Sequence, residues 1–375
     1  MWLGPSMPFG KIDVLIAGGG PAGCAAALQL RRRFPDLSIA VFEAGQHNVF
    51  KPGEVLPAVA GQLLDSLGVM AEFTAAGFLR GRSVASAWDN SEPIERHGVF
   101  SAQGAGWHLD RARFDRLMLE CVEQSGAKVR RSVTVRGATE VPNGWRIECS
   151  DGSSHEARIL IWATGRRWGL ARSLGARVTQ HEPLVAYSRF FSATDCNGQM
   201  MIEARPEGWW YCAALPGERR VITCLTDPDI GRELQLSDGG AWNNLLGQTK
   251  SMRARGTELA ATRRSAGTAT IDPVCGENWL AAGDTLLAAD PLSSRGIVHA
   301  LRSGMLAAYA AADMMSGRGH EAATRLRTLH AHGLTHYRRK LDEHYRAAAQ
   351  WDAPFWNRRV HRAASQPAGI HANEV

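Results

Sequence analysis

Near the start of the chain, hydrophobic residues form an unbroken run that ends in glycine, which is the pattern of a buried strand entering a turn. Residues 14–23 read Val-Leu-Ile-Ala-Gly-Gly-Gly-Pro-Ala-Gly, and a second apolar run ends at Glu43. A helix is expected to open at Pro21 between these two strands. The order of strand, glycine turn, helix, strand and acid predicts a dinucleotide-binding unit.

Each glycine of the turn has a separate expected role. Gly18 permits the tight turn, Gly20 lets the backbone approach a pyrophosphate, and Gly23 lets the helix pack closely on the strand. The helix that begins at Pro21 and Ala22 would face the pyrophosphate with the free N–H groups of the residues after Pro21 and with the positive end of its dipole. Glu43 is placed to accept hydrogen bonds from ribose hydroxyls, and its charge would repel the 2′-phosphate of NADP. The alternative is a glycine-rich turn without chemistry.

The remaining pattern predicts short strands first and longer strands later. Short strand-like runs occupy 80–108, 128–136, 145–149 and 158–163, and longer strands with polar turns fill 183–270. Helices are predicted around Leu63 to Met70, from Arg111 behind an acidic cap, and over 297–315 and 320–351.

These elements predict an α/β protein. The expected fold is a Rossmann-like nucleotide-binding domain with an inserted β-sheet substrate domain and C-terminal helices. The predicted boundaries are 1–80, 109–178 and 272–325 for the discontinuous nucleotide-binding domain, 81–108 and 179–271 for the substrate-binding sheet domain, and 326–375 for the helical segment.

Composition limits the compartment and the partners that we expect for the protein. In 375 residues no run of eighteen apolar residues occurs, so we expect no membrane span and no signal peptide, and a cytoplasmic location. The net charge of +6 comes mainly from dispersed arginine, which predicts a solvated basic face, with a docking surface for an acidic partner as the alternative. No motif points to nucleic acid binding.

Cysteine and histidine do not predict a metal site. The seven cysteines lack a CxxC pair and are expected to be buried free thiols. His330, His332, His336 and His344 have partly helical spacing, but no carboxylate or cysteine pattern accompanies them, so solvated histidines are expected.

Further segments indicate that the expected dinucleotide contains a flavin. Gly283 and Asp284 end an apolar strand, and Pro291 leads to a second glycine-gated helix start at Gly296 and Ile297. Asp284 could bind ribityl hydroxyls, and the dipole of the following helix would favour negative charge on a reduced flavin ring. The alternative role for Asp284 is a helix cap. Arg111 could reach the nucleotide from a helix opening or form a surface ion pair.

As an ordered set, these segments and Ala163-Thr164-Gly165 resemble the FAD-binding domain of flavin-dependent aromatic hydroxylases and tryptophan halogenases over nearly the whole chain. The resemblance implies that the Rossmann-like domain is an FAD-binding domain of the glutathione-reductase-like, aromatic-hydroxylase type. It also implies an FAD-dependent monooxygenase in which reduced FAD takes up O₂ as a C4a-hydroperoxide that an electron-rich ring attacks. The expected cofactor-binding residues are Gly18, Gly20, Pro21, Ala22, Gly23, Glu43, Lys51, Arg111, Val135, Gly283, Asp284, Pro291, Gly296 and Ile297.

Halogenases of this superfamily carry a relay lysine and a Trp-x-Trp-x-Ile-Pro motif. The stretch from Trp209 to Pro216 reads Trp-Trp-Tyr-Cys-Ala-Ala-Leu-Pro and keeps only the first tryptophan of that motif. Gly77-Phe78-Leu79-Arg80 stands where the lysine is expected, and the nearest lysine is Lys51. Oxygen insertion is therefore expected, with halogenation as the alternative.

The chain more closely resembles the halogenase-like flavoproteins that mature quinone cofactors of glycine oxidase, lysine oxidase and quinohemoprotein amine dehydrogenase. The segments that carry this resemblance are Lys51–Pro57, Ser86–Trp88, Gly208–Tyr211, Asp290–Ile297 and Trp351–Trp356. It implies hydroxylation of an indole or tryptophan-like substrate, free or in a partner protein or peptide. The candidates near flavin and substrate are Lys51, Glu54, Trp88, Trp209, Trp210 and Pro291.

Trp209 and Trp210 are adjacent on a predicted strand, so only one of the two can face the cavity. The reductant is left open between NAD(P)H and a separate flavin reductase, because no second GxGxxG is present. Two further alternatives are a non-catalytic FAD-binding chaperone of a partner protein, and a reductase or dehydrogenase acting on a prenyl or other alkene.

Overall fold

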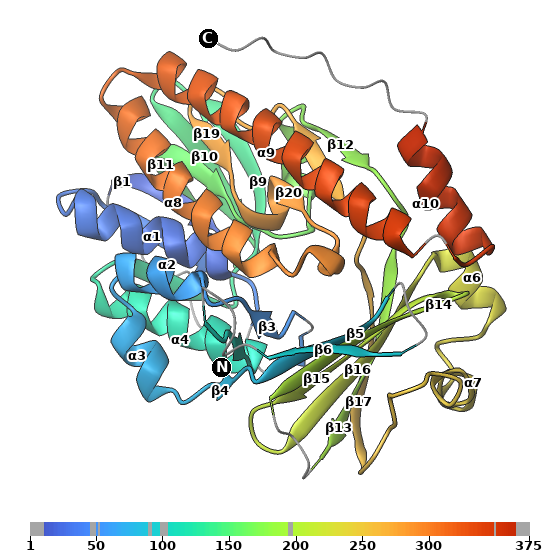
Figure 1. Cartoon of the computed structure of the whole chain (residues 1–375). Coiled ribbons are helices and arrows are strands. Elements are labelled where there is room, and N and C mark those ends of the chain that lie inside the picture. Colours follow the sequence, from blue (N-terminus) through green and yellow to red (C-terminus); the bar gives the residue numbers. More distant parts are fainter. Residues whose placement is uncertain are drawn as a thin grey trace.

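The computed structural model describes residues 11–45, 50–51, 53–88, 92–97, 104–193, 198–348 and 350–364. It has two large sheets, each of seven strands, and helices that cover the first sheet (Figure 1). Two expectations concern residues outside these ranges: the position of Pro52 in the Lys51–Pro57 loop, and the state of Cys196.

The first sheet carries the predicted nucleotide-binding unit. Its order is β8-β2-β1-β11-β10-β9, with β19 beside β11. The strands are β1 (Ile12–Ala17), β2 (Ile39–Glu43), β8 (Lys128–Arg131), β9 (Val135–Val141), β10 (Gly144–Cys149), β11 (Ser154–Trp162) and β19 (Trp279–Ala281). All pairings are parallel except those of β9 and β10. Parallel strands buried on both faces explain the continuous apolar runs.

Two helices meet over one face of this sheet. They are α1 (Pro21–Arg33), which begins directly after the glycine turn, and α8 (Gly296–Met315), more than 250 residues later in the chain. Gly304 permits their close packing, because a side chain there would overlap the carbonyl oxygen of Ala22. The helix α4 (Arg111–Gln124) packs against α1 as well, and Asp110 caps it by accepting a hydrogen bond from the N–H of Arg113.

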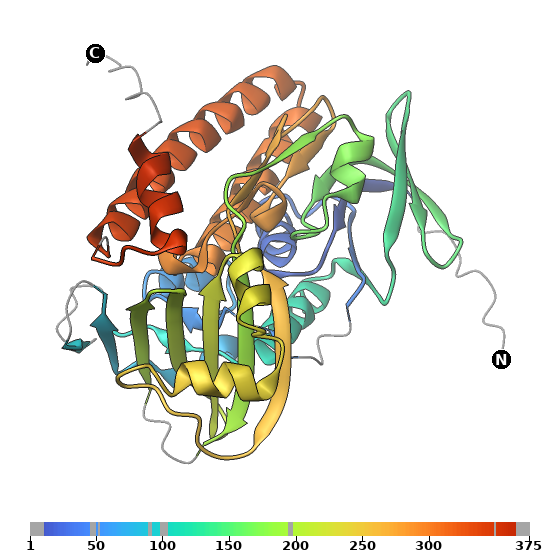
Figure 2. The same ribbon diagram turned by 90° about the vertical axis from the view of Figure 1, so that its right-hand side faces the viewer.

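The second sheet has the order β17-β13-β16-β15-β14-β5-β6 and lies below the helices in Figure 2. Its strands are β5 (Ser83–Ala87), β6 (Ile94–His97), β13 (Val185–Ser192), β14 (Gln199–Arg205), β15 (Gly208–Leu215), β16 (Arg219–Thr226) and β17 (Glu258–Ser265). Only the β14–β5 pairing is parallel, so this sheet is built mostly from hairpins.

Two three-stranded sheets complete the strands. One contains β12 (Arg177–Gln180), β18 (Ala269–Asp272) and β20 (Leu287–Ala288), and the other contains β3 (Val55–Leu56), β7 (Trp107–His108) and β4 (Leu79–Arg80). The remaining helices are α2 (Ala60–Ser66), α3 (Met70–Ala75), α5 (Gly169–Ser173), α6 (Pro228–Glu233), α7 (Gly239–Leu246), α9 (Gly319–Ala347) and α10 (Pro354–Ala364).

The α/β fold class is confirmed, and several elements differ from the prediction. Four strands, β8 to β11, replace the three expected between 128 and 163, because the turns at Ser132 and Gly144 have positive φ and divide the runs. The helix predicted around Leu63 to Met70 is two short helices, α2 and α3. The last predicted helix ends at Ala347, and α10 follows it. The division into domains stays a prediction.

Two short helices, α6 and α7, also interrupt the stretch that we expected to hold only strands and turns. They contain Gly231, Gly239 and Gly240, residues that lower helix propensity and hid the pattern. Within the described ranges, no helix is long and apolar enough to cross a membrane.

Candidate functional site

A cavity of about 1090 Å³ lies between the nucleotide-binding unit and the second sheet. Its walls include the glycine turn after β1, the end of β2 and the start of α8 on one side. On the other side they include inward-facing residues of β13, β14, β15, β16 and β17. Pockets for single small molecules measure roughly 300–1,000 Å³, so this cavity has room for more than one small molecule.

The three glycines of the turn have distinct surroundings. Gly18 has φ of +110°, and a Cβ there would overlap the carbonyl oxygen of Ala163. A Cβ on Gly23 would overlap the carbonyl oxygen of Gly18, so this glycine brings α1 against the turn. Gly20 differs, because a Cβ there meets no atom within 4 Å and the residue lines the cavity. Gly18 and Gly23 are thus required by the backbone packing of the turn, whereas the absence of a side chain at Gly20 leaves space in the cavity.

Glu43 lies at the cavity wall at the end of β2. Its Oε2 accepts a hydrogen bond from the N–H of Gly19 at 2.5 Å, and its Oε1 accepts one from the N–H of Gly45. A carboxylate has about four acceptor positions, so these two bonds fix the side chain without using its full capacity.

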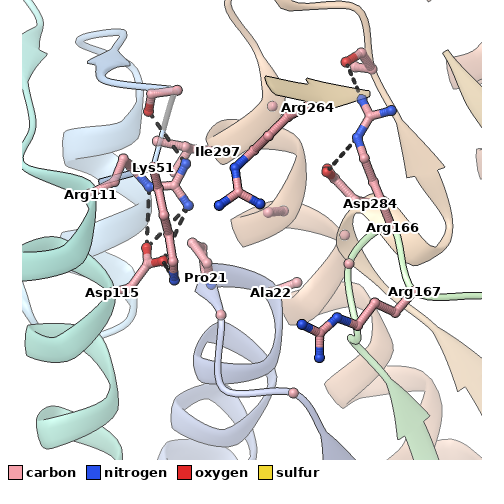
Figure 3. A pocket seen from close by; sticks show the side chains of 18 of the residues that line it. Pro21, Ala22, Lys51, Arg111, Asp115, Arg166, Arg167, Arg264, Asp284 and Ile297 are labelled. Carbon is pink, nitrogen blue, oxygen red and sulfur yellow. Dashed lines mark hydrogen bonds and ion pairs between the residues drawn. The ribbon is translucent and has the colours of Figure 1, made fainter. Parts of the chain in front are cut away.

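Two cations converge on one buried carboxylate where α4 begins (Figure 3). Lys51 Nζ lies 3.0 Å from Asp115 Oδ2, and Arg111 reaches Asp115 Oδ1 at 3.2 Å through both Nε and Nη2. The Asp115 side chain is only 3 % exposed. Arg111 therefore forms an ion pair, but a largely buried one and not the surface ion pair of the alternative, and it also lines the cavity. Lys51 lines the cavity with its ammonium directed to Asp115.

The second group of expected cofactor residues lies on the same side of the cavity as the glycine turn, since a Cβ on Gly283 would lie 2.7 Å from the Cβ of Ala22. Gly283 and Asp284 begin the short 3₁₀ turn Gly283–Thr285, and the α8 N-terminus follows at Gly296 and Ile297. Arg166 Nε lies 3.5 Å from Asp284 Oδ2, and the same guanidinium donates to the carbonyl of Gly267 (Figure 3). These residues line the cavity together with Val135 and Pro291.

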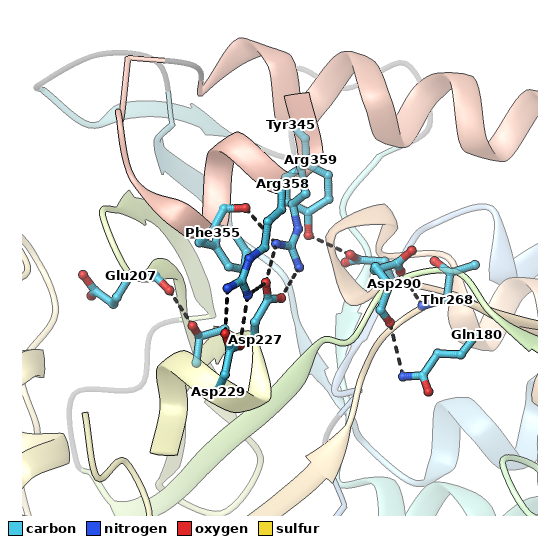
Figure 4. Close-up of polar contacts among 12 residues, drawn as sticks. Gln180, Glu207, Asp227, Asp229, Thr268, Asp290, Tyr345, Phe355, Arg358 and Arg359 are labelled. Carbon is cyan, nitrogen blue, oxygen red and sulfur yellow. Dashed lines mark hydrogen bonds and ion pairs between the residues drawn. The ribbon is translucent and has the colours of Figure 1, made fainter. Parts of the chain in front are cut away.

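Asp290, directly before Pro291, is held from α9 (Figure 4). Its Oδ2 accepts a hydrogen bond from the Tyr345 hydroxyl at 2.7 Å, and its Oδ1 accepts one from the N–H of Leu292. The backbone N–H of Asp290 donates to the Tyr337 hydroxyl at 2.7 Å. Burial raises the pKa of Asp290 to about 7. The turn at Pro291 is therefore fixed by two tyrosines of α9.

The helix after α9, α10, is attached to the end of the second sheet by a buried ion pair. Arg359 on α10 donates to Asp227 Oδ1 at 2.7 Å, and both side chains are buried. The neighbouring Arg358 donates to Asp227 at 2.9 Å and to Asp229 at 2.6 Å (Figure 4). Breaking a buried ion pair by removing one partner is strongly destabilising, so α10 is firmly held at the start of α6.

The structure brings only one of the three predicted tryptophans to the cavity. Trp209 lines it, whereas Trp210 points to the other face of β15 and packs against Trp242, with ring centroids 5.2 Å apart. This confirms that the pair faces opposite sides, but the placement of Trp210 near the cleft was wrong. Trp88 was also misplaced: it lies behind Trp209, and its indole N–H donates to the carbonyl of His344.

Glu54 lines the cavity, and it has a partner that the sequence reasoning missed. The Tyr211 hydroxyl donates to Glu54 Oε2 at 3.1 Å, and both residues line the cavity. Tyr211 figured in the sequence only as a departure from the halogenase motif. Its position two residues after Trp209 places both on one face of a strand, which was the available signal.

The described cysteines are free, as expected, and five of the six are buried. Burial raises the pKa of Cys24 and Cys224 well above the usual value. Thiols in apolar surroundings are unreactive, which gives these two residues packing roles.

Comparison with known sequences agrees with this geometry. A family model described as lycopene cyclase protein matches residues 13–181, less than half of the chain. The putative FAD-dependent oxidoreductase LodB of Marinomonas mediterranea is 29% identical over 307 residues, which is 78% of this chain and 82% of that protein. The chain is thus similar to FAD-dependent oxidoreductases along most of its length.

Solved structures identify the fold. The myxobacterial chondrochloren halogenase CndH superposes with a TM-score of 0.84 at 20% identity, covering 94% of this chain and 88% of that one. The chain has a flavin-dependent halogenase-like fold. The peptidyl tryptophan dihydroxylase QhpG, essential for tryptophylquinone cofactor biogenesis, has a TM-score of 0.76 at 21% identity, covering 98% of this chain and 81% of that one. This fold therefore occurs in both a halogenase and a hydroxylase.

Proposed function

We propose that this protein is an FAD-dependent monooxygenase that hydroxylates an electron-rich aromatic ring of the indole or tryptophan type. The observation that carries the proposal is the single cavity in which a dinucleotide-type glycine turn faces an apolar sheet wall. Met200, Ile202, Trp209 and Leu225 contribute to that wall. A cofactor and an aromatic ring could therefore meet in one cavity.

The residues present fit FAD. The open space above Gly20 and the N-terminus of α1 suit a pyrophosphate, since backbone N–H groups and the helix dipole favour an anion there. Glu43 would receive the ribose hydroxyls, and Arg111 and Lys51 would offset the phosphate charge. Asp284, Val135, Pro291, Gly296 and Ile297 would surround the remainder of the cofactor. FAD, when bound and reduced, would supply the activated oxygen.

The protein's own contribution is to orient the substrate ring and exclude water. Trp209 is 2 % exposed and could stack an aromatic ring by its face or edge. The tyrosine contacts on Asp290 would fix the Pro291 turn beside the reaction site. The apolar residues of the sheet wall would help to keep water from the reactive oxygen chemistry.

Oxygen insertion is favoured over halogenation by the position of the lysine. The halogenases that the sequence resembles relay hypohalous acid through a lysine. Lys51 is the sole lysine among the described residues that line the cavity, and Asp115 holds its ammonium at 3.0 Å. A cation bound in this way is poorly placed to hold an electrophile next to the substrate.

The test is the mass of the product. Protein loaded with FAD, supplied with a reductant and air, is given indole in an excess of bromide, and the products are analysed by mass spectrometry. We expect a gain of oxygen. A brominated ring as the major product would instead support the halogenase alternative, with which the similarity to CndH is equally compatible.

We further propose that the chain belongs to the quinone-cofactor maturation type, with a tryptophan residue of a partner protein or peptide as substrate. The similarity to LodB and the fold shared with QhpG support this assignment. Tryptophan-containing peptides and free tryptophan, offered side by side, would separate the two substrate forms. Comparing NADH, NADPH and an added flavin reductase as electron sources would identify the reductant.

A further inference from the structure

The part of the cavity wall that belongs to the second sheet contains a single charged residue among the residues that the structure describes. It is Arg264 on β17, the strand at one edge of that sheet. Its side chain extends into the cavity, and no hydrogen bond or ion pair joins it to another of the residues drawn in Figure 3. Arg264 is exposed, so a molecule in the cavity can reach its guanidinium group.

Three cations on the nucleotide-binding side of the cavity differ, because each has an acidic partner. Lys51 and Arg111 both contact the carboxylate of Asp115, and Arg166 lies 3.5 Å from Asp284. The arginine on β17 has no such partner within the described part of the chain. A bound anion would therefore not have to displace a carboxylate in order to pair with it.

The strand pattern fixes the direction in which Arg264 points. The preceding residue, Arg263, lies on the other face of the sheet, where its guanidinium carbon is 5.7 Å from the centre of the Tyr187 ring. Tyr187 belongs to the hydrophobic cluster that packs on that face. Because neighbouring residues of a strand point to opposite faces, Arg264 lies on the cavity face. The strand thus carries two adjacent arginines, of which only the second lines the cavity.

Arg264 is one end of a row of residues that crosses the cavity face. Ala186 on β13 is paired with Arg264 on one side and with Leu225 of β16 on the other. Leu225 is in turn paired with Trp209 of β15, and all four residues line the cavity. With strands about 4.8 Å apart, the backbones at the two ends of the row are roughly 14 Å apart. An aromatic ring lying over Ala186 and Leu225 would have an indole on one side and a guanidinium on the other.

We propose that Arg264 binds a carboxylate attached to the aromatic substrate and thereby selects aromatic acids over their neutral analogues. A guanidinium forms two parallel hydrogen bonds with a carboxylate, so it fits this group better than other anions of one charge. The carboxylate would be the α-carboxylate of free tryptophan or the side chain of an acidic residue next to a tryptophan in a peptide. This inference rests on the proposed function and adds the group that recognises the polar end of the substrate.

The test compares ligands that differ only in this charge. The first pair is N-acetyltryptophan and N-acetyltryptophanamide, and the second is acetyl-Ala-Trp-Glu-amide and acetyl-Ala-Trp-Gln-amide. Their dissociation constants are measured by calorimetry on FAD-loaded protein at low salt. In at least one pair the native protein should bind the acid about fivefold or more tightly than the neutral ligand, because hydrogen bonds between charged groups are the stronger ones. The pair that shows this preference identifies the source of the carboxylate.

Two variants show whether Arg264 causes the preference. In Arg264→Gln the ratio of the two dissociation constants should fall to near one, with unchanged FAD content. Arg264 is exposed on an edge strand, so its replacement should leave the protein folded. Arg263→Gln is the matched control, because it removes the same charge from the neighbouring position on the opposite face. The ratio in Arg263→Gln should stay at the native value.

The other outcomes contradict the inference. Equal binding within both pairs by the native protein, or a native ratio in Arg264→Gln, would overturn it and leave the proposed function intact. An equal loss of preference in Arg263→Gln would also overturn it, since the effect would then come from the net charge. Loss of FAD from Arg264→Gln with an unchanged ratio would assign Arg264 to the cofactor instead.

The salt dependence of the native protein keeps the inference testable if Arg264→Gln does not fold. Because salt screens accessible ion pairs, the preference for the acid should weaken between about 50 mM and about 500 mM salt. A preference that does not change with salt would overturn the inference. Failure of the FAD-loaded native protein to bind any of the four ligands would refute the proposed function as well.

Discussion

Gly20 gives the sharpest prediction about cofactor binding, because the structure separates the needs of the fold from those of the ligand. Gly20 has φ of −76° and ψ of −177°, a conformation that any residue can adopt. A Cβ there meets nothing within 4 Å. Gly20→Val should therefore leave the stability of the apoprotein within about 0.5 kcal/mol of the native value.

The same substitution should prevent FAD binding. The valine methyl groups would occupy the space next to the first N–H groups of α1, where the pyrophosphate is expected. Moving the phosphates by more than a hydrogen-bond length would remove several charge-assisted hydrogen bonds, each worth about 1.5–3 kcal/mol. Losing two of them raises the dissociation constant by a factor of at least about 100.

The assay combines FAD titration followed by fluorescence with thermal unfolding of the apoprotein. Gly23→Ala is the matched control, because its Cβ would overlap the carbonyl oxygen of Gly18. The Gly23→Ala apoprotein should therefore be less stable than the native apoprotein, in the absence of FAD. Stoichiometric FAD on a folded Gly20→Val protein would refute the placement of the pyrophosphate.

The other predictions concern the aromatic pair and the buried acid. Trp210→Ala should cost about 3–5 kcal/mol in urea unfolding, because the buried indole also donates to Glu207 Oε1 at 2.8 Å. Trp209→Ala should also lose stability, since Trp209 is 2 % exposed. Of the two variants, only Trp209→Ala should raise KM for the aromatic substrate. Equal KM values in the two variants would refute the cavity role of Trp209. Burial raises the pKa of Asp290 to about 7, so between about pH 4, the pKa in the unfolded chain, and about pH 7 the folded protein keeps a proton that the unfolded chain loses. The free energy of unfolding therefore falls as pH rises through this range, and Asp290 adds no further change above it. Tyr345→Phe removes a hydrogen bond that lowers this pKa, so the pKa of Asp290 should be higher in the variant. The free energy of unfolding should then continue to fall between about pH 7 and pH 8 only in the variant. Parallel pH profiles of the two proteins would contradict this.

Local rules made the nucleotide-binding half predictable from the sequence. Gly23 packs against Gly18 within one strand–helix unit, and Glu43 follows at the end of the adjacent strand. Gly18 also lies close to Ala163, which comes from a distant segment. Alternation along a strand also predicted that Trp209 and Trp210 face opposite sides. It could not say which of them faces the cavity, because that depends on which face of the second sheet the other elements cover.

The missed features depend on residues far apart in the chain. The hydrogen bond from Tyr345 to Asp290 spans 55 residues, the one from Tyr211 to Glu54 spans 157, and the pair of Arg359 and Asp227 spans 132. No periodicity or spacing relates such partners. Trp88 was misplaced for the same reason, because residues of α9 and α10 pack around it.

The most direct test of the central claim is the origin of the oxygen in the product. FAD-loaded protein is reduced without air, mixed with indole, and then exposed to ¹⁸O₂ in the presence of bromide. We predict that the major product contains one atom of labelled oxygen for each ring hydroxylated. An unlabelled or brominated product would contradict the monooxygenase assignment.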